Sequence, residues 1–185
     1  EVGIEQAERA ASMLATLRPR RIISSDLSRA RATAEPLARI TGVPIELDPA
    51  LRETFAGEWE GLTRAELESG YGAMLAQWSA GSDVRPGHTG ESRIEVAERV
   101  AGAVQRGLEG IDPGEVLVVV THGGAARAGI GAILGLPSEH WAVLGVLSNC
   151  SWTLLVENLT PYGPRWRMQE YNAGTLPGPA LADDR

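Results

Sequence analysis

The stretch Leu117–Gly124 (LVVVTHGG) decides the fold. Its four consecutive apolar residues predict a strand of a parallel sheet that is buried on both faces. The strand ends at His122, and Ala125–Ala128 (AARA) after the two glycines predicts the start of a helix. In open α/β sheets, ligands bind at the carboxyl ends of the strands. His122 is therefore expected at a ligand-binding edge. The glycines and the free N–H groups of the helix start favour an anion as the ligand.

Two further segments place polar residues at the end of a predicted strand in the same way. Ile22–Ala34 (IISSDLSRARATA) predicts a short strand, a polar turn and a helix with arginines in its first turns. Leu51–Gly61 (LRETFAGEWEG) places Glu53 at the end of a strand, ahead of a loop that contains glycine. Because the carboxyl ends of parallel strands meet at one edge of a sheet, these side chains are expected near His122.

Together these segments resemble the histidine phosphatase superfamily, the phosphoglycerate mutase-like enzymes. In that family the patterns S-S-x-L-x-R-A-x-x-T-A, L-x-E-x-x-x-G-x-W-E-G and T-H-G-G occur in this order. The turn Gly90–Ser92 (GES) and the segment Asn149–Trp152 (NCSW) are also similar to the family. The resemblance implies a three-layer α/β/α sandwich with a largely parallel sheet. It further implies hydrolysis of a small phosphorylated metabolite, such as a phosphoglycerate or sugar phosphate derivative, through a phosphohistidine intermediate and without a metal or other cofactor.

The resemblance also implies roles for individual residues. Arg29 would clamp two phosphate oxygens through its planar guanidinium. His122 would hold a phosphoryl oxygen and stabilise the charge that develops during transfer, together with the backbone N–H of Gly123. Glu53 would act as the general acid that protonates the leaving alcohol. Each of these residues also has a plain structural interpretation, as a loop histidine, a solvated helix arginine or a surface glutamate.

Two weaker candidates for substrate contact are His88 and Asn149. His88 lies in the glycine-containing turn PGHTGES and could equally be a loop residue with no catalytic role. Asn149 resembles a residue that holds the active-site loops in the family, but a turn-forming role fits nearly as well. Glu58 and Glu60 compete with Glu53 for the role of the acid.

The Arg-His-Gly signature of the family, which carries the nucleophilic histidine after an N-terminal strand, occurs nowhere in the sequence. We therefore expect that an N-terminal piece is absent. Its strand would be an interior strand of the sheet, so its loss should expose ladder groups and apolar surface. Two alternatives to a phosphatase stay open. One is a phosphoglycerate-type mutase, which uses the same machinery; the other is a catalytically inactive protein that binds a phospho-ligand or acts as a scaffold.

Composition bounds the class of protein. The 185 residues have a net charge of −7 and are 43% hydrophobic, as in one ordinary globular domain. The acidic balance argues against nucleic acid or an anionic membrane as a partner. The three histidines are far apart and Cys150 is the single cysteine, which predicts neither a metal site nor an internal disulfide. No apolar run is long enough for a membrane span, so the cytoplasm is the expected location. A homodimer stays open.

Strand-like and helical segments alternate along the chain, which predicts a single α/β domain over residues 1–174. Pro36 is expected to kink or restart the helix over Leu27–Ile40, and Gly42 should end it. The excursion Glu58–Glu91 is typical of a lid or substrate wall. The tail Thr175–Arg185, rich in Pro, Gly and Asp, is expected to be flexible. The strand-like segments are Arg21–Ser24, Ile45–Leu47, Val116–Thr121, Ser151–Val156 and Trp166–Tyr171.

Overall fold

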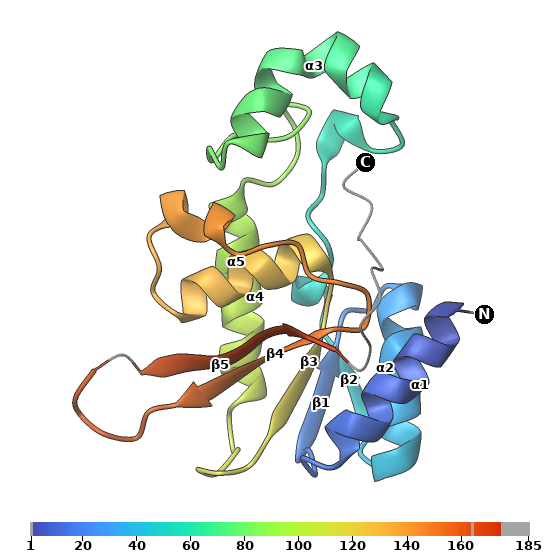
Figure 1. Cartoon of the computed structure of the whole chain (residues 1–185), viewed down its shortest axis with the longest axis vertical. Helices are drawn as coiled ribbons and strands as arrows, with labels where there is room; N and C mark the ends of the chain where they lie inside the picture. Colours follow the sequence, from blue (N-terminus) through green and yellow to red (C-terminus); the bar gives the residue numbers. More distant parts are fainter. Residues whose placement is uncertain (1, 164, 175–185) are drawn as a thin grey trace.

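A parallel three-stranded sheet forms the centre of the protein (Figure 1), in a computed structural model that describes residues 2–163 and 165–174. Its strands are β1 (Arg21–Ser24), β2 (Ile45–Leu47) and β3 (Leu117–Val120), in the order β2-β1-β3. Ile22 of β1 is aligned with Ile45 on one side and with Val118 on the other. All three carboxyl ends therefore meet at one edge of the sheet, as the sequence predicts.

Helices cover both faces of this sheet, which confirms the three-layer α/β/α sandwich. On one face lie α1 (Val2–Ala15) and α2 (Ser28–Thr41), and on the other lie α4 (Arg93–Gly107) and α5 (Gly123–Ile133) (Figure 1). Because successive strand residues point to opposite faces, Ile22 and Ile23 join different cores. The first core comprises Ala11, Ile22, Ala34, Leu37 and Val118. The second comprises Ile23, Leu51, Val96, Ala97, Val100, Ala103, Ala125, Ala128 and Trp141.

A second ladder lies beside the parallel sheet. It consists of β4 (Trp152–Glu157) and β5 (Trp166–Ala173), which pair with each other in antiparallel orientation. Within the described residues neither strand pairs with β3. The sequence predicted both segments as strands, but the structure divides the strands into a parallel and an antiparallel group with a gap in the ladder between them.

Two of the helices begin with capping boxes. At α4, the Ser92 hydroxyl accepts from the Glu95 N–H, and the Glu95 carboxylate accepts from the Ser92 N–H. At α3 (Arg64–Ser79), Thr63 and Glu66 make the same reciprocal pair. Each box satisfies two backbone donors that the first turn of a helix leaves without intrahelical partners.

The helix α2 continues through Pro36 rather than restarting there. Pro36 is buried, because this side of the helix packs toward α1 and the sheet, and that packing outweighs the loss of one backbone hydrogen bond. The helix ends as predicted at Gly42, whose φ of 72° lies in the left-handed region and whose N–H donates to the Ala38 carbonyl at 2.8 Å.

The excursion between β2 and α4 extends away from the sheet and carries α3 at its far end (Figure 1). Trp59 is buried there, with its ring edge-on to Tyr71 at 6.0 Å and to Trp78 at 6.2 Å. Short 3₁₀ helices occupy Pro49–Leu51, Gly57–Trp59 and Ser138–Val143. The predicted tail Thr175–Arg185 lies outside the described residues.

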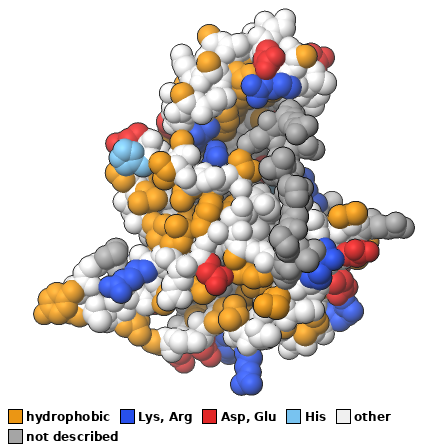
Figure 2. Space-filling model, viewed as in Figure 1, with side chains coloured by type: hydrophobic (Ala, Val, Ile, Leu, Met, Phe, Trp, Pro, Cys, Tyr) orange, Lys and Arg blue, Asp and Glu red, His pale blue; other side chains and the backbone are white. Residues whose placement is uncertain are grey.

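Apolar side chains gather on the face that carries α5 and the β4–β5 ladder (Figure 2). Exposed hydrophobic residues of this part of the chain include Val143, Val146, Val156 and Met168. No helix in the described part of the chain has both the length and the apolar character that a membrane span requires.

Candidate active site

The candidate site lies where β1 and β3 end, at the carboxyl edge of the sheet. Ser25 directly follows β1, His122 lies two residues after the end of β3, and both are buried. Arg29 extends from the first turn of α2 and donates from Nε to His122 Nδ1 at 3.1 Å. Ser25 Oγ lies 2.9 Å from His122 Nε2. Two segments 93 residues apart thus converge on one imidazole, as the strand-end argument predicts.

These contacts fix the protonation of His122. Arg29 Nε is always a donor, so Nδ1 must accept and the ring proton resides on Nε2, which donates to Ser25 Oγ. Burial lowers the pKa of His122 below its ordinary value of 6.5, and the positive charge of Arg29 lowers it further. The imidazole is therefore held neutral, with its Nε2–H as a hydrogen-bond donor at the sheet edge.

Glu53 meets the same site from the loop after β2. Its carboxylate accepts from the backbone N–H of Ala125 at 2.8 Å and of Gly124 at 3.1 Å. These groups belong to the first turn of α5, where the helix dipole favours a negative charge. A Cβ at Gly124 would lie 2.7 Å from Glu53 Oε1, so glycine at this position permits the close approach of the carboxylate.

Arg99 holds the loop that carries Glu53, and sequence reasoning did not identify it. Its guanidinium forms a bidentate pair with Glu91, at 2.7 and 2.8 Å. It also donates to the carbonyls of Ala50, Arg52 and Glu53 at 2.8, 2.7 and 3.1 Å. This Arg is one of many on helix faces, and nothing in the sequence separates it from a solvated residue. Only the fold brings α4 against the loop.

Of the other predicted site residues, some line the cavity that contains His122 and one lies outside it. Gly123 and Asn149 line the same cavity as His122, and Asn149 donates from Nδ2 to Gln6 Oε1 at 2.8 Å. His88 is exposed, has a φ of 58° and lies beside Tyr71, outside that cavity.

The two carboxylates that competed with Glu53 are also placed elsewhere. Glu58 accepts from the Tyr71 hydroxyl at 3.0 Å, and Glu60 accepts from the Ala56 N–H at 3.2 Å. Of the three carboxylates considered for the acid role, Glu53 alone reaches the first turn of α5. In the part of the chain that the structure describes, no cluster of three His, Cys, Asp or Glu residues is suited to hold a metal ion.

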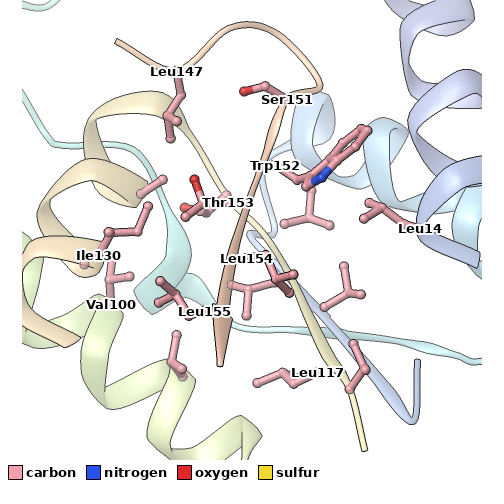
Figure 3. Close-up of a pocket in the computed structure, with 18 of the residues that line it drawn as sticks. Leu14, Val100, Leu117, Ile130, Leu147, Ser151, Trp152, Thr153, Leu154 and Leu155 are labelled. Atoms are coloured by element: carbon pink, nitrogen blue, oxygen red, sulfur yellow. The ribbon is translucent and has the colours of Figure 1, made fainter. Parts of the chain in front are cut away.

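A cavity of about 1350 Å³ runs from this site down between β3 and β4 (Figure 3). Arg29, Glu53 and His122 line its polar end. Its apolar walls come from both helical layers and from the two strands, with side chains such as Leu14, Val100, Leu117, Ile130, Leu154 and Leu155. Among the described residues, the Oγ1 of Thr153 on β4 is buried without a hydrogen-bond partner.

The edge of β3 that faces this cavity has unpaired backbone groups. Ser25 N–H donates to the Val120 carbonyl and Arg20 N–H to the Val116 carbonyl, so the even-numbered residues of this segment face β1. Successive strand residues present their backbone groups to opposite edges, which directs those of Leu117 and Val119 toward the cavity. Within the described residues, the unpaired ladder groups of Leu117 and Val119 therefore lie against the apolar walls of the cavity.

Comparison with known proteins agrees with this geometry. Residues 1–174 match the histidine phosphatase superfamily (branch 1). The chain is 41% identical over 185 residues to the glucosyl-3-phosphoglycerate phosphatase of Mycobacterium tuberculosis, covering 94% of this chain and 82% of that protein. It is 36% identical over 154 residues to a probable phosphoglycerate mutase of Cronobacter sakazakii, covering 82% and 69%.

A solved structure gives the same relationship in three dimensions. The complex of a mycobacterial glucosyl-3-phosphoglycerate phosphatase with inorganic phosphate is 37% identical, with a TM-score of 0.85 over 94% of this chain and 86% of that one. The strand-end histidine, the order of the three motifs and the overall superposition lead to one conclusion: this chain belongs to the histidine phosphatase superfamily and is a phosphatase with the phosphoglycerate mutase-like fold.

Proposed function

We propose that this protein hydrolyses a phosphomonoester of a glycerate or sugar-glycerate metabolite, of the class named by its relative glucosyl-3-phosphoglycerate phosphatase, in the cytoplasm and without a metal ion. The observation that carries the proposal is the convergence of Arg29, His122 and the start of α5 on one sheet edge. The oxygens of a transferring phosphoryl group suit the in-plane N–H groups of the Arg29 guanidinium, the N–H of a neutral imidazole and the backbone N–H groups at the start of α5.

Each residue of the site has its own role in the reaction. A nucleophilic histidine attacks phosphorus and the P–O bond to the alcohol breaks, while Glu53 gives its proton to the departing alcohol oxygen. Water then attacks the phosphohistidine, Glu53 takes back a proton, and inorganic phosphate leaves. Arg29 and the Gly123 N–H hold two phosphoryl oxygens through both steps, and the His122 Nε2–H exchanges the Ser25 hydroxyl for the third oxygen, where charge accumulates.

The nucleophile of this proposal is not among the three histidines of the chain, because none stands in an Arg-His-Gly sequence. We infer that it is carried by an extended segment outside these 185 residues that occupies the cavity between β3 and β4. Apolar walls on both sides and the free ladder groups of Leu117 and Val119 suit a buried strand. A strand there would end beside His122 and Arg29, which line the polar end of the same cavity.

The test is hydrolysis of an aryl phosphate in the presence of a chelator. The 185-residue chain should be inactive and, because its apolar cavity is open, oligomeric on size-exclusion chromatography. A longer version with a strand and Arg-His-Gly at its amino end should be active in chelator. Activity of a monomeric 185-residue chain would overturn the assignment and make His122 the candidate nucleophile. Formation of 2-phosphoglycerate from 3-phosphoglycerate would favour the mutase alternative, which the similarity to probable phosphoglycerate mutases supports.

A further inference from the structure

Two arginines lie together beside the candidate site. Arg93, at the start of α4, and Arg127, in α5, line a small cavity of about 30 Å³ with Thr54 and Gly124. Thr54 directly follows Glu53 and Gly124 donates to the Glu53 carboxylate, so this cavity adjoins the proposed acid. Arg127 also lines the large cavity that contains Arg29 and His122. It therefore borders both spaces.

The Arg93 side chain is held in a fixed orientation. Its guanidinium stacks over the Trp78 ring, 4.2 Å from the ring centroid, and donates to the Trp78 carbonyl at 2.5 Å. Stacking occupies the face of a guanidinium and leaves its remaining N–H groups free to bind in the plane. Arg93 is thus preorganised as a planar donor beside the small cavity that Arg127 also lines.

The pair carries two positive charges, and in the part of the chain that the structure describes no carboxylate forms an ion pair with either. Every ion pair found among the described residues involves other arginines. Burial lowers the pKa of Arg93 and the charge of Arg127 lowers it further, while Asp83 has a weaker opposing effect. Two juxtaposed cations in a partly buried position repel each other unless an anion lies between them.

We propose that Arg93 and Arg127 form a second anion subsite, which binds the carboxylate of a phosphoglycerate-type substrate while Arg29 and His122 bind its phosphate. The inference rests on the proposed function. It identifies the carboxylate as the part of the substrate that decides specificity. The cavity that the two arginines line has a volume of about 30 Å³, which admits a small anionic group and excludes a sugar ring. A carboxylate accepts in-plane pairs of N–H donors from guanidinium groups.

Binding to the 185-residue chain tests the subsite without requiring turnover. Isothermal titration would compare inorganic phosphate, glycerol 3-phosphate and 3-phosphoglycerate; the last two share a phosphoglyceryl skeleton and differ in the carboxylate. The wild-type chain should bind 3-phosphoglycerate about 10–100-fold more tightly than glycerol 3-phosphate, the range for hydrogen bonds to a charged group. Arg127→Gln should remove that preference and leave the affinity for inorganic phosphate within about twofold of the wild type.

Matched variants separate the subsite from folding and from the phosphate site. Arg93→Lys keeps the charge but lacks the planar fork, and should lose most of the preference; its melting temperature reports separately on the lost contacts with Trp78. Arg31→Gln, on the exposed side of α2, should change none of the three affinities. Equal affinities of the wild-type chain for 3-phosphoglycerate and glycerol 3-phosphate, with phosphate binding abolished by Arg29→Gln, would overturn the subsite and leave the proposed function standing. Failure of inorganic phosphate to bind the longer version that carries the Arg-His-Gly segment would overturn both.

Discussion

Arg29 Nε donates to His122 Nδ1 at 3.1 Å, and this contact defines the chemistry available at the sheet edge. It forces the imidazole to be neutral with its proton on Nε2. It also leaves the terminal nitrogens of Arg29 available to an anion, since the described structure gives them no ion pair. One residue therefore sets the protonation state of its neighbour and offers the planar donors that phosphate requires.

Arg29→Lys should weaken binding of inorganic phosphate by about 10–100-fold, because an ammonium cannot donate two parallel hydrogen bonds and cannot reach both phosphate and His122. The affinity would be measured by titration calorimetry on the purified chain. Arg31→Lys, two residues away on the exposed side of α2, is the matched control and should bind phosphate normally. Equal affinities for the two variants would exclude Arg29 from the anion site.

The free energy of unfolding should fall as the pH drops below about 6.5. Burial and Arg29 lower the pKa of His122 in the folded state, so the unfolded chain takes up a proton at a higher pH than the folded chain does. This contribution to the stability is fully present above the pKa of His122 in the unfolded chain. It is lost as the pH falls toward the pKa of His122 in the folded chain. Urea unfolding between pH 8 and pH 5 measures this dependence.

Between pH 8 and pH 5, the free energy of unfolding of His122→Gln should depend less on pH than that of the wild type. Its absolute stability need not match the wild type, because only the slope with pH reports the titration. The carboxyls of Asp26 and Glu91 act at lower pH, since hydrogen bonds from Arg52 and Arg99 lower their pKa values below the ordinary carboxyl range. An unchanged slope in His122→Gln would show that another group titrates.

Gly124→Ala should destabilise the protein by about 0.5–1.5 kcal/mol, the net contribution of a hydrogen bond between groups that are not fully buried. The added Cβ would lie 2.7 Å from Glu53 Oε1 and push the carboxylate away from the first turn of α5. The neighbouring Gly123→Ala is the control, because its Cβ would come no closer than 4.0 Å to the Leu147 carbonyl. Chemical denaturation of both variants would test the difference, and equal effects would contradict the steric argument.

Glu53→Gln keeps the shape of the side chain and removes its proton. In an enzyme version that carries the nucleophilic histidine, it should slow hydrolysis of an alkyl phosphate by about 10²–10⁴-fold. An aryl phosphate has a better leaving group and should lose less activity. Steady-state rates on both substrates show whether Glu53 donates a proton to the leaving group. Equal losses would indicate that Glu53 positions the substrate and does not donate a proton. Glu60→Gln, in the same loop region but bonded to Ala56, should retain the wild-type rates.

Local patterns in the sequence were sufficient to predict most elements. Gly42 marked the end of α2, and the apolar run before His122 placed β3 to within two residues. The positions of strand ends were also enough to predict that Arg29 and His122 would meet, whereas Glu53 reaches them from a loop that a 3₁₀ helix separates from β2 and not from the end of a strand. This succeeds because parallel strands share one edge, so a residue's place relative to its own strand fixes its place in space.

Other features depended on contacts between segments distant in sequence. The Arg99 clamp on the Glu53 loop, the pairing of Arg93 with Arg127, and the position of His88 away from the cavity have no local signal. The same holds for the uninterrupted helix at Pro36, where tertiary packing outweighs propensity. The sequence by itself determined the elements and the edge at which the chemistry occurs, because those follow from the period and polarity of neighbouring residues. Only the tertiary structure decided which charges face one another, because helix orientation depends on how the two cores pack around the sheet.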